Sequence, residues 1–157
     1  MKDLIWAILL LVVALGITAW YKSSQKSKGN IIDRKKDFAE YAEIFTIRKI
    51  TDEEFAEAVK KADFKGTLNT TVTGDTGKLF LEQGKYYKAR IAHTQQNEAS
   101  SVYRFEFLSW TSKHGAPSYS IEMNKLMTKV EKMFLEIDPN AQVASVKNEI
   151  KTDRSLF

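Results

Sequence analysis

Residues 85–110, KYYKARIAHTQQNEASSVYRFEFLSW, are the stretch that decides the fold of this chain. Apolar side chains occupy every second position on both sides of the polar loop QQNEAS, which is the period of two half-buried β-strands. If both odd-numbered sets face one core, Ile91 lies opposite Phe105, and Arg90 lies opposite Glu106 on the other face. Opposite charges across a strand pair contribute about 0.2–1 kcal/mol, so this register is favoured.

Two more strands are predicted before this pair. TLNTTVT begins at Thr67, KLFLE begins at Lys78, and turn-forming residues follow each of them. Together the four segments predict a meander of about four antiparallel strands. A turn at Gln83-Gly84 would place Leu81 opposite Tyr86 on the outer face of the sheet.

Helical spacing predicts two helices before the meander and one after it. Phe38, Tyr41 and Phe45 suggest a helix from about Asp33 to Arg48, and the capping box that begins at Thr51 starts a second one. The strongest amphipathic pattern runs from 118 to 137 and carries most of the methionines, which fill core gaps. Residues 142–150 suggest a last strand. The predicted class is therefore α+β.

An uncharged run of 18 residues, LIWAILLLVVALGITAWY, covers positions 4–21. As a helix it would span roughly 27 Å, close to the bilayer core of about 30 Å. Leu4 and Trp6 at one end, with Trp20 and Tyr21 at the other, suit a transmembrane helix with interfacial aromatics. A cleaved signal peptide and a buried helix of a globular domain are the two alternatives.

The excess positive charge follows this run directly. Within 22–36 there are six basic residues and one acidic residue, whereas 37–157 holds 17 basic and 18 acidic residues. Under the positive-inside rule, the soluble domain would face the cytoplasm. The cations expected to contact anionic lipid headgroups are Lys22, Lys26, Lys28, Arg34, Lys35 and Lys36. A nearly neutral domain disfavours nucleic acid as a partner.

These patterns divide the chain into a transmembrane anchor at 1–21, a basic juxtamembrane tether at 22–32 and an α+β domain at 33–157. The outer face of the meander would collect Leu79, Leu81 and Leu108 beside basic side chains. Such a patch is either covered by the helices of 33–62, giving three layers, or open to a partner. The residues expected to bind a protein partner are Tyr86, Arg90, Arg104 and Trp110. The same strip could also stack and clamp single-stranded nucleic acid, which the neutral domain disfavours.

No catalytic, metal or cofactor site is predicted. The chain has no cysteine, and its two histidines, His93 on the inward face and His114 in a loop, do not have metal-ligand spacing. The acidic residues after Thr51 are explained by the helix dipole. Phosphate-binding and nucleophile-elbow motifs are absent from the sequence.

An N-terminal hydrophobic helix followed by an α/β head resembles the plan of type IV pilin-like proteins. This chain lacks the glycine before the run and the glutamate within its first residues.

The sequence therefore predicts a non-enzymatic, single-pass membrane protein with a signal-anchor, whose cytoplasmic domain binds a protein partner. The alternatives are an outward-facing envelope or pilin-like subunit, and an enzyme with an unrecognised site.

Overall fold

A computed structural model describes residues 2–113, 116–148 and 153–155, and it divides the chain into two units, 1–33 and 34–157. The first unit contains helix α1, Lys2–Ser27. This helix continues from its apolar residues into residues 22–27, so half of the predicted tether is helical.

The transmembrane prediction is wrong. In the part of the chain that the structure describes, no helix is both long and apolar enough to cross a bilayer. The anchor of Leu4, Trp6, Trp20 and Tyr21, the single-pass location and the cytoplasmic assignment are therefore withdrawn.

The predicted contacts between these basic residues and lipid headgroups depended on the transmembrane anchor, so they are withdrawn with it. Lys26 forms an ion pair with Asp33. Arg34, predicted to be a surface cation, is only 10 % exposed and bridges Glu43 and Glu131. The four remaining cations, Lys22, Lys28, Lys35 and Lys36, are exposed.

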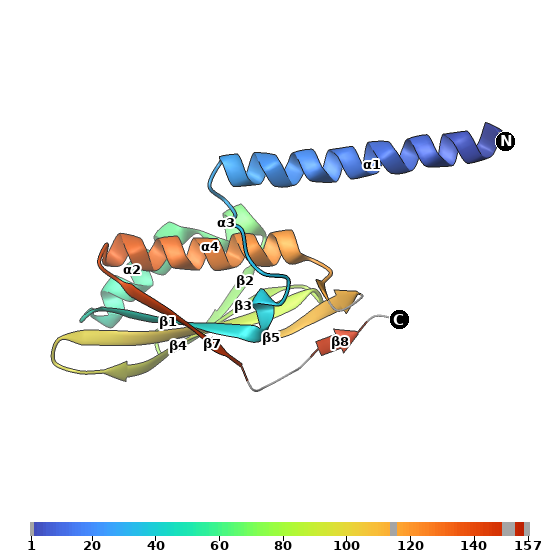
Figure 1. Ribbon diagram of the computed structural model, residues 1–157. Coiled ribbons are helices and arrows are strands. Elements are labelled where there is room, and N and C mark those ends of the chain that lie inside the picture. Colours follow the sequence, from blue (N-terminus) through green and yellow to red (C-terminus); the bar gives the residue numbers. More distant parts are fainter. Residues whose placement is uncertain (1, 114–115, 149–152, 156–157) are drawn as a thin grey trace. The chain divides into compact units, whose positions relative to one another are not determined.

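The second unit is an α+β domain built on one mixed sheet (Figure 1). Seven strands are antiparallel, in the order β2-β3-β4-β5-β1-β7 with β6 beside β5, and β8 pairs with β5 in parallel. The strands are β1 (Tyr41–Arg48), β2 (Thr71–Gly74), β3 (Lys78–Gln83), β4 (Tyr87–Gln96), β5 (Ser100–Lys113), β6 (Ala116–Pro117), β7 (Gln142–Lys147) and β8 (Asp153–Ser155). The predicted meander is β2 to β5.

The helix predicted at 33–48 is wrong, because this segment forms a short 3₁₀ turn, η1 (Phe38–Glu40), and then strand β1. The chain alternates there, with Phe45 and Ile47 buried on one face and Ile44 and Thr46 half-buried on the other. β-branched and aromatic residues favour a pleated surface over a helix. Strand β1 lies between β5 and β7, inside the sheet.

The capping-box helix is confirmed as α2, Asp52–Ala62. The Thr51 hydroxyl accepts a hydrogen bond from the Glu54 amide at 3.2 Å, and the Glu54 carboxylate accepts one from the Thr51 amide at 3.0 Å. A short helix α3, Phe64–Leu68, follows directly. The strongest amphipathic pattern forms α4, Ser120–Ile137.

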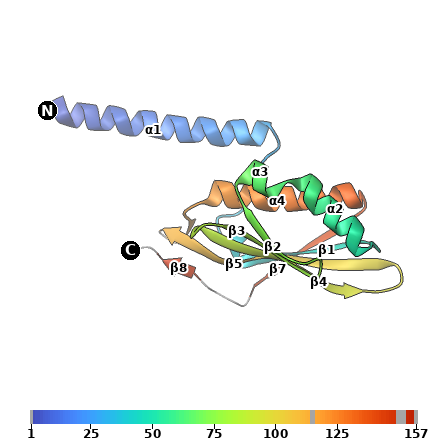
Figure 2. The same cartoon turned by 180° about the vertical axis from the view of Figure 1, so that it is seen from behind.

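All three helices of this unit lie on one face of the sheet (Figures 1 and 2). Of the two arrangements left open for the outer face, the three-layer one is therefore wrong, and the unit has two layers. Its core is aromatic: Phe45 stacks on Phe134 of α4 at 4.4 Å between ring centroids, and Phe55 of α2 stacks on Tyr103 at 4.8 Å. Within residues 34–148, no helix covers the opposite face of the sheet, which we call the open face.

Candidate functional site

The open face carries two arginines that share one carboxylate. Strand register places Arg90 of β4 opposite Glu106 of β5, as the sequence predicted, and Ile91 opposite Phe105. Arg90 forms an ion pair with Glu106, and Arg104 donates from Nε to the other carboxylate oxygen at 3.0 Å. Glu106 is 2 % exposed, whereas each arginine side chain is 27 % exposed. The buried carboxylate therefore holds two partly exposed guanidinium groups on the surface.

A fourth side chain completes this cluster from the far end of the sheet. Asn148, directly after β7, donates to the Glu106 carboxylate at 2.8 Å and accepts from Arg104 at 3.3 Å. Its backbone amide donates to the Glu40 carbonyl at 2.7 Å, which fixes its position. Because residue 148 is distant from β5 in the chain, no local sequence signal indicated its role.

The electrostatics of the cluster favour an ionised Glu106. Burial raises the pKa of this carboxyl, but the hydrogen bonds and charges of Arg90 and Arg104 outweigh burial, so its pKa lies below the usual value. The cluster of two guanidinium groups and one carboxylate thus keeps a net positive charge. Arg90 Nε is buried and has no hydrogen-bond acceptor among the described residues, which leaves a donor unsatisfied.

The surroundings of the cluster mix apolar and basic side chains. By register, Ile44, Val102 and Phe80 share the open face with it, and all three are half-buried. Lys88 lies over the Phe80 ring at 4.8 Å and forms a 2.6 Å ion pair with Glu82. A half-apolar surface with fixed guanidinium groups at its centre suits recognition of carboxylates.

Trp110, predicted to be part of the binding surface, lies in the core instead. The register between β4 and β5 shifts at Lys88/Ala89, so Leu108 is an extra residue on β5. A one-residue shift moves every later side chain to the other face of the sheet. Trp110 therefore pairs with Tyr87 and is only 7 % exposed.

Tyr86 is also separated from the arginines. It lies in the loop between β3 and β4, where its ring packs on that of Tyr119 at 3.7 Å between centroids. The loop holds the three residues 84–86, and Gly84 adopts φ 51°, a left-handed conformation that glycine tolerates. The resulting register pairs Leu81 with Ala89, so Leu79 and Leu81 are buried rather than on the predicted outer patch. The structure thus brings together two of the four predicted binding residues.

Among the described residues, no group of three or more His, Asp or Glu side chains could hold a metal ion. The His93 ring stacks on Tyr103 at 4.7 Å between centroids, and its Nε2 is buried without a hydrogen-bond partner in the described chain. His114 lies outside the described residues. The removal of Trp110 and Tyr86 from the basic strip also removes the predicted aromatic platform for nucleic-acid bases.

A second ionic cluster lies on the helix side of the sheet. Arg34 contacts Glu43 of β1 at 3.2 Å and Glu131 of α4 at 2.7 Å, and it donates from Nε to Asn124 at 3.3 Å. Burial, with repulsion from Glu131, raises the pKa of Glu43 to about 8. One guanidinium therefore serves two carboxyl groups, and the raised pKa of Glu43 favours its protonated form. This cluster joins the start of the domain to its sheet and helix layers.

Comparison with known proteins finds no family model, no curated protein and no solved structure that matches this chain.

Proposed function

We propose that the domain is a non-enzymatic binding module whose open face docks an acidic segment of a protein partner. The observation that carries this proposal is the pair of guanidinium groups, 27 % exposed, held by a buried Glu106 on the open face, which no helix within residues 34–148 covers. Guanidinium groups fixed in this way lose little conformational freedom when they bind a carboxylate.

The chemistry of the open face supports a protein as the occupant. Arginine is enriched at the energetic centres of protein interfaces, where apolar neighbours exclude water. Ile44, Val102 and Phe80 supply such neighbours around the cluster. The basic residues Lys78 and Lys88 on the same face complement an acidic partner.

Paired substitutions test the proposal. The tagged protein is cross-linked to its native partners in cells, and Arg104→Gln is compared with Arg48→Gln. Arg48 is a matched control because it also forms an ion pair, with Glu54, but lies at the end of β1. We expect Arg104→Gln to lose the partner and Arg48→Gln to keep it, with both variants equally folded by circular dichroism. Equal capture by both variants would overturn the proposal.

A further inference from the structure

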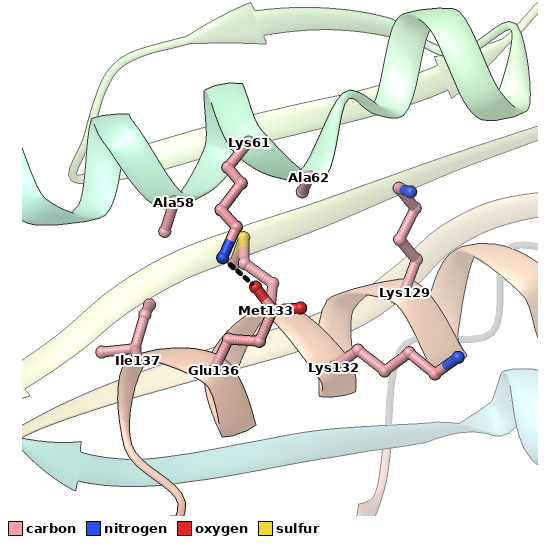
Figure 3. Close-up of a pocket in the computed structure, with 8 residues that line it drawn as sticks. All are labelled: Ala58, Lys61, Ala62, Lys129, Lys132, Met133, Glu136 and Ile137. Atoms are coloured by element: carbon pink, nitrogen blue, oxygen red, sulfur yellow. Dashed lines mark ion pairs between the residues drawn. The ribbon is translucent and has the colours of Figure 1, made fainter.

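A concave surface lies on the helix layer, between α2 and α4 (Figure 3). Its volume is about 220 Å³. The apolar part of its lining comes from Ala58 and Ala62 of α2 and from Met133 and Ile137 of α4. The hollow exists because α2 presents two alanines where larger side chains would fill the space between the helices.

The rim of this groove is basic. Lys61, Lys129 and Lys132 line it together with a single carboxylate, Glu136. Lys61 and Glu136 form a 2.8 Å ion pair between the two helices, and both are well exposed to solvent. Lys129 and Lys132 add further positive charge beside Glu136 and help to lower the pKa of its carboxyl, after the larger effect of Lys61. The groove therefore combines an apolar lining with a net positive rim.

The size of the groove restricts the class of its ligand. Pockets for cofactors and drug-sized molecules usually measure about 300–1,000 Å³. A volume of about 220 Å³ suits one apolar anchor side chain of a longer ligand rather than a whole small molecule. Peptide segments of protein partners commonly place apolar anchor side chains in hydrophobic grooves.

We propose that this groove binds a short acidic peptide segment of a protein partner, with one apolar side chain in the hollow. Carboxylates that flank the anchor face the lysines of the rim, so the charge of the groove selects acidic over basic segments. This site lies on the helix face, opposite the open face with Arg90 and Arg104, and it therefore goes beyond the function proposed above.

The probe is a short fluorescein-labelled peptide in which glutamates flank a single leucine, titrated by fluorescence anisotropy into the full chain at low salt. We expect saturable binding that weakens about tenfold or more in Lys129→Glu. Lys60→Glu should bind like the original, because Lys60 is exposed on α2 but does not line the groove. Replacing the leucine of the probe by serine, or its glutamates by lysines, should abolish binding.

Two further measurements distinguish the site. Amide chemical shifts should move at Ala58, Ala62 and Met133 on titration, and Ala62→Leu, which fills the hollow, should weaken binding while retaining the fold by circular dichroism. Loss of peptide binding in Arg104→Gln would assign the peptide to the open face and overturn the proposal. Equal competition by octanoate would identify a fatty acid as the occupant and would also overturn the proposal. Concentration-dependent dimers in sedimentation that the peptide dissociates would identify a second copy of the chain as the occupant, with the same consequence. Unchanged binding in Lys129→Glu would also contradict it.

Discussion

Replacing Glu43 by glutamine should stabilise this protein at alkaline pH. Glu43 is 5 % exposed, and Arg34 must serve both it and Glu131. Burial and the neighbouring carboxyl raise the pKa of Glu43 from 4.5 to about 8. Between these values the folded protein binds more protons than the unfolded chain, so stability falls as the pH rises.

The expected magnitude follows from the width of this window. One pKa unit corresponds to about 1.4 kcal/mol, so the shift of Glu43 sets a ceiling of about 5 kcal/mol on the stability lost from pH 4.5 to pH 8. Adjustment of Arg34 and entry of water reduce this loss, and we expect roughly 2–3 kcal/mol. Glutamine keeps the shape of the protonated carboxyl but cannot ionise, so the variant should lack this loss.

Urea unfolding followed by tryptophan fluorescence measures the effect directly. The free energy of unfolding of Glu43→Gln, minus that of the original chain, should rise from near zero at pH 4.5 to about 2–3 kcal/mol at pH 8. Taking the difference cancels the titration of groups that do not interact with Glu43. Glu57→Gln, on the exposed side of α2, is the matched control and should show no such rise. A difference that stays flat with pH, or a variant less stable at pH 8, would refute the reasoning.

Four other substitutions test the packing, the open face and the helix cap. Trp110→Ala and Phe105→Ala should each lower the free energy of unfolding, measured in urea, by about 3–5 kcal/mol, because both side chains are buried. An unchanged unfolding midpoint for Trp110→Ala would show that its side chain is exposed. Glu106→Gln should cost about 1–3 kcal/mol at neutral pH, since it weakens charged hydrogen bonds to two arginines. The pKa of Glu106 is lowered in the folded protein, so its ion pairs stabilise the fold above the pKa of Glu106 in the unfolded chain. This stabilisation is lost as the pH falls through the pKa of Glu106 in the folded protein. If Glu106→Gln still destabilised the protein in strong acid, the loss of stability would not come from the ion pairs. Thr51→Ala should lower the free energy of unfolding by about 1 kcal/mol, which thermal unfolding can detect. An unchanged melting temperature would show that the capping box does not stabilise α2.

Local chemistry predicted the elements whose signals are short-range. The capping box at Thr51, the amphipathic pattern of α4 and the pairing of Arg90 with Glu106 each depend on residues a few positions apart or on one strand pair, and the structure contains all three. The helix predicted at 33–48 failed because apolar residues at spacings of three and four also fit a strand when both of its faces are partly buried. The position of β1 between two other strands depends on long-range pairing with β5 and β7, which the residues of β1 alone do not indicate.

The binding surface was only half predictable because strand faces depend on parity. A three-residue loop at 84–86, in place of the expected turn, moves Leu81 from the outer to the inner face. The extra residue Leu108 does the same to Trp110. Each error is an odd shift in register, and the alternation of a strand gives no warning of it. Arg90 and Arg104 lie on the side of the bulge where the predicted register holds, so they remained together.

Site-specific photo-cross-linking in cells tests whether the open face of the sheet contacts a protein partner. A photo-reactive residue at Ala92, opposite Arg104 by register and half-buried on the open face, is compared with one at Glu57 on the exposed side of α2. We predict a cross-linked protein from position 92 that disappears when Arg104→Gln is added. No protein adduct from position 92, or an adduct that persists without the arginine, would contradict the account.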